Sequence, residues 1–177
     1  YQNRPAGYLK NVTIRDLNVD VAFERPDYAY EVRGPDLPFF HNTFPASITG
    51  IPGSKVQDVV LENITINYPG RGNNGLANRP LSRLGSIPEK ISDYPEFSMF
   101  GELPAWGLYV RHVEGLILKN IRMGIEEPDY RPAMVFDDVH DLTIQRLNID
   151  GDQKVNRIIV RQSDKVSLET IPGVLKM

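Results

Sequence analysis

Carboxylates are the side chains of this sequence that could carry acid–base chemistry. Asp137 and Asp138 form the most prominent acidic pair, and glycoside hydrolysis uses two carboxylates about 5–10 Å apart across the scissile bond. Adjacent residues of a strand point to opposite faces, so these two can share a substrate only where a turn separates them. Asp is also common at turns for conformational reasons. The sequence therefore favours a structural role for this pair.

A second set of side chains suits the binding of an acidic sugar. In the expected strand 107–112, Tyr109 and Arg111 lie on one face because alternate residues share a side. The segment before this strand adds aromatic rings, which can stack on sugars, and Arg, which can grip a carboxylate with two hydrogen bonds. The alternative is that these side chains only pack the segment onto the fold. The candidates for substrate binding are Arg111, Tyr109, Trp106, Tyr94, Arg83 and Arg79.

Other chemistries lack the residues that they need. Three His and no Cys leave no transition-metal cluster and no thiol chemistry. No Gly-rich phosphate loop or serine nucleophile motif is present. A formal net charge of −3 argues against nucleic-acid binding, and no apolar run is long enough to span a membrane. We therefore predict no metal, no cofactor, no nucleic acid and no membrane partner. Residues 1–10 also lack the features of a signal peptide.

A repeated strand–corner–strand pattern must position these residues. Apolar residues alternate on both sides of a polar corner in five segments, which begin at residues 12, 59, 116, 142 and 166. The last three starts follow one another at nearly equal intervals, and the interval has the length of one turn of a parallel β-helix. Asp16, Asn63 and Asn120 occupy the same corner, where stacked amides can form a hydrogen-bonded ladder. The pattern predicts one all-β domain over residues 1–177, a partial solenoid.

The same alternation predicts which residues form the interior of the stack. Every second residue of a strand faces the same side, so the apolar positions of successive repeats should form one column. The members of this column are Val12 and Ile14, Val59 and Leu61, Leu116 and Leu118, Leu142 and Ile144, and Val166 and Leu168.

Two long segments interrupt the repeats, at about residues 23–45 and 68–106. Loops of this length without strand patterns are uncommon and are usually functional or mobile. In the second, Ser86 and Glu89 have the spacing of a helix capping box. The sequence therefore predicts a short helix over residues 88–93.

Residues 8–14 (Tyr-Leu-Lys-Asn-Val-Thr-Ile) resemble the Gly-Tyr-x-Arg-Asn-Ile-Thr segment of glycoside hydrolase family 28, the polygalacturonase-like enzymes. Residues 48–53, 94–107 and 129–133 are similar to the later part of the Bacteroidetes-type members. The resemblance implies a right-handed, pectin-lyase-like parallel β-helix that hydrolyses pectic polymers with inversion. It also implies a periplasmic or extracellular location and an acidic polysaccharide or oligosaccharide as partner.

The sequence also departs from this family. The Asn-Thr-Asp, Asp-Asp, Gly-His-Gly and Arg-Ile-Lys motifs of family members precede the Gly-Tyr segment, and this chain contains none of them. Asp137 and Asp138 follow that segment, so they do not inherit the catalytic role, and we expect no catalytic residue in this chain. Two hypotheses stay open, and with them the question of enzymatic activity. The chain is the C-terminal part of a glycoside hydrolase, supplying scaffold coils and a groove wall, or a non-catalytic polysaccharide-binding or interaction module. Its open N-terminal edge should stack on upstream coils of the same polypeptide or self-associate.

Overall fold

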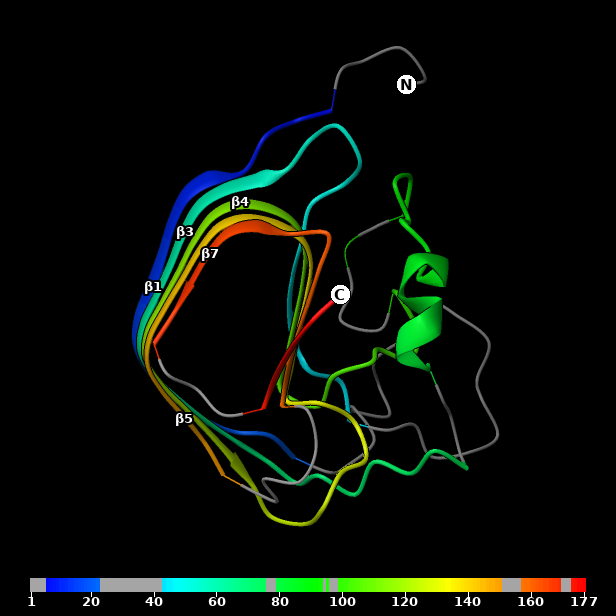
Figure 1. Cartoon of the computed structure of the whole chain (residues 1–177), viewed down its shortest axis with the longest axis vertical. Coiled ribbons are helices and arrows are strands. Elements are labelled where there is room, and N and C mark those ends of the chain that lie inside the picture. The colour runs from blue at the N-terminus through cyan, green and yellow to red at the C-terminus, as the bar shows by residue number, and fades with distance from the viewer. Residues whose placement is uncertain are drawn as a thin grey trace, which may run out of the picture.

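Figure 1 shows the chain as a computed structural model, which describes residues 6–22, 43–75, 79–93, 95, 99–150, 157–169 and 173–177. The described residues are mostly β-strand with one helical segment, the 3₁₀ helix η1 (Leu81–Ser86), so the all-β prediction is confirmed. Eight strands form one parallel sheet. The strands are β1 (Lys10–Asp20), β2 (Ala46–Thr49), β3 (Val56–Tyr68), β4 (Leu108–Ile125), β5 (Met134–Ile149), β6 (Ile158–Arg161), β7 (Asp164–Leu168) and β8 (Val174–Lys176).

The strands pair in the register that the repeat predicts. One row of Cα partners runs from Val12 of β1 through Val59 and Leu116 to Leu142 and Val166. A second row of pairings joins the starts of β4 and β5 to the short strands β2, β6 and β8. Figure 1 shows the long strands following one curved path, each beside the next. The repeat offsets in the sequence thus correspond to physical neighbours.

The long strands bend at residues whose φ is positive, and these bends align from strand to strand. Asp16, Asn63, Asn120 and Arg146 have φ values of 57°, 55°, 55° and 52°, and Asn and Asp tolerate this conformation better than most residues. Asn120 Nδ2 donates to Asn63 Oδ1 at 2.8 Å, and Asn63 Nδ2 donates to Asp16 Oδ1 at 2.9 Å. The predicted amide ladder at this corner is therefore confirmed.

The predicted interior column lies on one face of the strands and is buried in the middle of the stack. Leu116, Leu118 and Leu142 have no exposed surface, and Ile144 is 1% exposed. At β1 the same column is more open, because no described strand covers its outer edge, and Ile14 is 44% exposed. The remaining members are buried or pack against the core from partly buried positions; they are Val12, Val59, Leu61, Val166 and Leu168.

A second apolar cluster lies on the opposite face of β4, β5 and β6. There the strands are covered by the described parts of residues 79–105, which we name the insertion segment (Figure 1). This segment lies between the end of β3 and the start of β4, as the predicted interruption at 68–106 requires. Most of the other predicted interruption, 23–45, lies outside the described residues. The cluster consists of Leu84, Ile87, Leu103, Ala105, Tyr109, Val135 and Ile159.

The prediction of a helix over residues 88–93 is wrong. The helical turn η1 ends at Ser86, and the residues that follow are irregular or in a turn. Ser86 Oγ donates to the carbonyl of Arg83 at 2.8 Å, within η1, and so does not cap a following helix. The carboxylate of Glu89 instead contacts Arg111 and His112 of β4.

Candidate functional site

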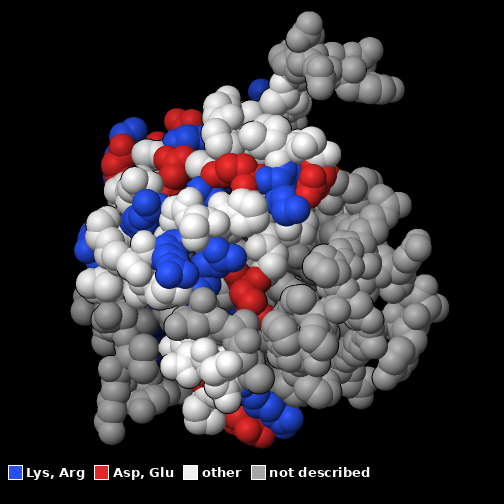
Figure 2. Space-filling model, turned by 90° about the vertical axis from the view of Figure 1, so that its right-hand side faces the viewer, with Lys and Arg blue, Asp and Glu red and all other residues white. Residues whose placement is uncertain are grey.

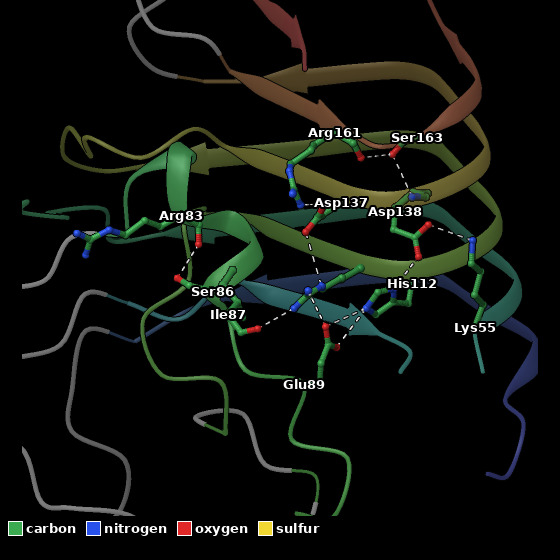
Figure 3. A network of polar contacts seen from close by, with 12 residues as sticks. Lys55, Arg83, Ser86, Ile87, Glu89, His112, Asp137, Asp138, Arg161 and Ser163 are labelled. Atoms are coloured by element: carbon green, nitrogen blue, oxygen red, sulfur yellow. Dashed lines mark hydrogen bonds and ion pairs between the residues drawn. The ribbon is translucent and has the colours of Figure 1, made fainter. Parts of the chain in front are cut away.

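A row of alternating charges crosses the strands beneath the insertion segment. Arg111, Asp137 and Arg161 are direct register neighbours on β4, β5 and β6. The side chain of Asp137 is 1% exposed, and Arg161 Nη1 donates to its Oδ1 at 2.7 Å (Figure 3). Arg111 Nε lies 3.6 Å from the other carboxylate oxygen. Two guanidinium groups thus compensate the charge of a buried carboxylate.

Arg111 also holds the insertion segment onto the sheet. Its Nη1 donates to the backbone carbonyl of Ile87 at 2.9 Å, and its Nη2 lies 2.6 Å from Glu89 Oε1. The side chain of Arg111 is only 11% exposed, so these contacts are largely shielded from solvent. One guanidinium therefore joins a strand to the backbone and to a carboxylate of the covering segment.

The next residues along the strands, His112 and Asp138, occupy a second aligned bend, with φ values of 53° and 57°. His112 Nδ1 lies 2.6 Å from Asp138 Oδ2, and its Nε2 lies 3.1 Å from Glu89 Oε2 (Figure 3). Asp138 Oδ1 accepts a hydrogen bond from Lys55 Nζ at 3.1 Å and lies 2.8 Å from His140 Nε2. The bend therefore gathers side chains from β4, β5, the turn before β3 and the insertion segment.

The protonation of this cluster follows from its contacts. Burial opposes ionisation of Asp138, but hydrogen bonds from His112, His140 and Lys55 together outweigh it and lower the pKa of Asp138 to about 2. The pKa of His140 is raised by its hydrogen bond to Asp138 and then by that to Asp164, whose Oδ1 lies 2.8 Å from Nδ1. Asp138 is thus ionised at neutral pH and is poorly suited to donate a proton to a substrate.

Two of the predicted substrate-binding rings are buried. Tyr109 has no exposed surface, since the insertion segment covers it, and burial raises the pKa of its hydroxyl. Trp106 is 5% exposed and faces the interior, where its ring meets that of Tyr68 edge to face with centroids 5.6 Å apart. These two rings therefore pack inside the fold, which is the alternative to sugar binding that the sequence left open. Tyr94 lies outside the described residues.

The predicted basic residues have three different environments. Arg111 is paired beneath the insertion segment, as described above. Arg79 is partly buried and donates to Ser86 Oγ at 3.0 Å and to the carbonyl of Glu102 at 3.3 Å, which ties the segment together. Arg83 is exposed on η1 and points away from the charged cluster (Figure 3), and its guanidinium has no ion-pair or hydrogen-bond partner among the described residues. The structure thus brings Tyr109 and Arg111 onto one face but places Trp106 on the other.

Sequence reasoning missed most of this cluster, although the repeat offsets contain part of the signal. His112 and Asp138 are separated by the same offset as the repeat starts at 116 and 142, and the residues on either side of them pair across β4 and β5. The offset between the starts at 142 and 166 likewise pairs Asp137 with Arg161 and His140 with Asp164. The positions of Glu89 and Lys55 follow from no such offset, since both lie outside the repeats.

Acidic and basic side chains are interspersed over the described part of the face turned to the viewer in Figure 2. Within the described ranges, no group of three or more His, Asp or Glu side chains has an arrangement that could hold a metal ion. Helices long and apolar enough to cross a membrane are likewise absent from the part of the chain that the structure describes. Comparisons with protein-family models, with curated proteins and with solved structures gave no match to this chain.

Proposed function

We propose that this chain forms coils of a right-handed parallel β-helix in a polygalacturonase-like glycoside hydrolase. In that enzyme it supplies scaffold coils and one wall of a groove for an acidic polysaccharide. The right-handed sense is the one that connections between parallel strands adopt in nearly all proteins. The sequence resemblance to glycoside hydrolase family 28 motivates the activity, and also a periplasmic or extracellular location.

One observation carries this proposal. β4 pairs in parallel with β2 before an aligned bend and with β3 after it, and β5 pairs with β6 before this bend and with β7 after it. A chain that returns to the same register once in every repeat builds a stack in which each pass contacts its neighbours. Such stacks carry inserted segments on one side, where they can line a binding surface.

The edge of β1 supports stacking of further coils on this chain. Ile14 and Leu17 are 44% and 41% exposed. In the same register rows, two strands further on, Leu118 is fully buried and Ile121 is 3% exposed. A strand placed beside β1 would bury these apolar side chains and pair the backbone groups of the β1 edge that no described strand covers. We propose upstream coils of the same polypeptide as the neighbour, with self-association through this edge as the competing outcome.

The contacts of the two carboxylates support a scaffold role for this part of the proposed enzyme. Asp137 is enclosed by Arg111 and Arg161, and Asp138 is held by three donors. Hydrolysis needs one carboxylic acid that can give up a proton and a second carboxylate on the other side of the bond. We therefore assign the catalytic carboxylates to coils outside this chain, and the exposed Arg83 to the groove wall.

Binding of oligogalacturonate, measured by calorimetry, tests the proposed groove wall. Arg83→Ala should weaken binding on the order of ten-fold, as expected for loss of one charge-assisted contact. Arg146→Ala removes an exposed Arg at the bend of β5, outside the insertion segment, and should leave the affinity unchanged. A neutral oligosaccharide of equal length should bind poorly. Equal affinity for both sugars, or equal effects of both substitutions, would remove Arg83 from the groove.

Hydrolysis of polygalacturonate by the protein from its natural source tests the enzymatic part. We expect activity there, and we expect it to survive Asp138→Asn at reduced stability, because Asp138 only supports the scaffold. This chain alone should release no reducing ends. Binding without hydrolysis by the natural protein would instead favour the non-catalytic module.

A further inference from the structure

We propose that His112 is a proton-dependent latch for the insertion segment. The segment is held fully on the sheet while both ring nitrogens of His112 carry a proton, and it loosens when one proton is lost. This inference concerns the attachment of the covering segment and does not rest on the carbohydrate proposal, since its test needs no ligand.

A carboxylate lies against each ring nitrogen of His112. Nδ1 lies 2.6 Å from a carboxylate oxygen of Asp138, and Nε2 lies 3.1 Å from one of Glu89. An ionised carboxylate only accepts hydrogen bonds, and a neutral imidazole donates through one nitrogen only. Both contacts are therefore hydrogen bonds only in the imidazolium form. After loss of one proton, a ring lone pair faces a carboxylate.

The contact with Glu89 should be the one that weakens. Asp138 lies within β5, paired to β4 on one side and to β6 and β7 on the other, and its carboxylate is also held by Lys55 and His140. Glu89 lies in an irregular stretch of the insertion segment. The neutral tautomer that keeps its proton on Nδ1 retains the shorter contact and turns a lone pair toward Glu89. Deprotonation therefore acts on the segment rather than on the strands.

The surrounding charges set how far the latch opens. Arg111 keeps its own contacts with Glu89 and with the Ile87 carbonyl when His112 is neutral, so the segment should loosen without leaving the sheet. The His112 side chain is 13% exposed, so protons can reach it from solvent. The charged and titratable groups that face this cluster come from every element packed there: Lys55, Glu89, Arg111, Asp137, Asp138, His140, Arg161 and Asp164.

Hydrogen exchange of the full chain, measured at a series of pH values from roughly pH 5 to pH 9, tests this latch, because imidazole side chains as a class change charge near neutral pH. The reporters are the amides of Arg83 and Ile87, which bond to the carbonyls of Pro80 and Leu84 inside the segment. After correction for the intrinsic pH dependence of exchange, their protection should fall on the order of ten-fold with rising pH. The amides between β4 and β5 are the internal reference, because they report global unfolding, and their protection should fall less than that of the segment. Ring ¹⁵N shifts of His112, recorded on the same samples, identify which ring nitrogens carry a proton at each pH.

Two variants make this test decisive. His112→Gln offers amide groups that do not titrate, so the pH dependence of segment protection should disappear. The matched control is His140→Gln, since that imidazole joins β5 to β7 and does not contact the segment, and the pH dependence should remain. Should His112→Gln fail to fold, Glu89→Gln decides, because a neutral amide can pair with either form of the imidazole. Protection that stays constant while His112 loses its proton, or a pH dependence that persists in both His112→Gln and Glu89→Gln, overturns the latch.

Discussion

The two faces of β4 and β5 are held by different interactions. On the inner face, apolar side chains such as Leu116 and Leu142 meet in register and are fully buried. On the outer face, Tyr109 and Val135 share an apolar cluster with the insertion segment, and charged groups close its edge. Apolar packing has no preferred direction, whereas a hydrogen-bonded ion pair fixes an orientation. The inner face thus accounts for the stability of the stack, and the outer face for where the segment is held.

This comparison predicts its largest effect for the inner face. Leu116→Ala should lower the free energy of unfolding, because the side chain is fully buried in the middle of the stack and its removal leaves a cavity. Such substitutions cost about 2–5 kcal/mol, and we expect a loss in the upper part of that range. Denaturant titration followed by circular dichroism measures this loss. The control is Ile117→Ala, one residue away and 41% exposed, which should cost under about 1 kcal/mol. Similar losses for both substitutions would mean that the stack is not stabilised by its inner column.

A substitution on the outer face should cost less free energy of unfolding and should act mainly on the insertion segment. Asp137→Asn leaves Arg111 and Arg161 facing a neutral group and should cost about 3 kcal/mol, the low end for a broken buried pair, because the Arg161 side chain is 25% exposed. Hydrogen exchange should then find the insertion segment less protected than β4 and β5. Replacing the exposed Asp141 by Asn is the control, since its pair with Lys165 lies at the surface. Uniform loss of protection over both faces would break the distinction between them.

The inner face could be predicted from the sequence, because its signal repeats. The offset from 116 to 142 alone pairs Leu118 with Ile144 and Asn120 with the next corner at Arg146. Alternation then assigns the buried side, and the polar corner gives the bend. These features depend only on residues near one another along a strand and on one constant shift.

The outer face could not be predicted in the same way, because the insertion segment has no period. Ser86 and Glu89 match a capping box, but Arg111 and His112 bind the Glu89 carboxylate, so tertiary contacts override the local pattern. Alternation correctly places Tyr109 and Arg111 on one face, yet no pattern in the strand shows that another segment covers that face. Binding was predicted for a ring that the structure buries.

The corner ladder should contribute less than either face. Asn63→Gly removes both amide hydrogen bonds but keeps the positive φ accessible, and it should cost about 1 kcal/mol because the bonds are exposed. Asn63→Ala should cost about 1 kcal/mol more, since a Cβ is strained in this conformation. Thermal denaturation of the two variants side by side measures the difference. Equal stabilities would show that the bend does not depend on the conformational tolerance of Asn63.

The smallest expected effect is on the pH dependence of stability, through His140, which joins β5 to β7 outside the insertion segment. Hydrogen bonds to Asp138 and Asp164 raise the pKa of His140 above its ordinary value of 6.5. A folded-state pKa above the unfolded one means that the folded chain binds the proton more tightly, so the contribution is complete below about pH 6.5 and is lost as pH rises through the folded pKa. Asp138 behaves in the opposite sense, and its contribution is lost only as pH falls toward 2. The free energy of unfolding, measured from roughly pH 6 to pH 9, should therefore decline less steeply with pH for His140→Gln than for the unaltered chain. Identical slopes would mean that His140 gains no proton affinity from its contacts with Asp138 and Asp164.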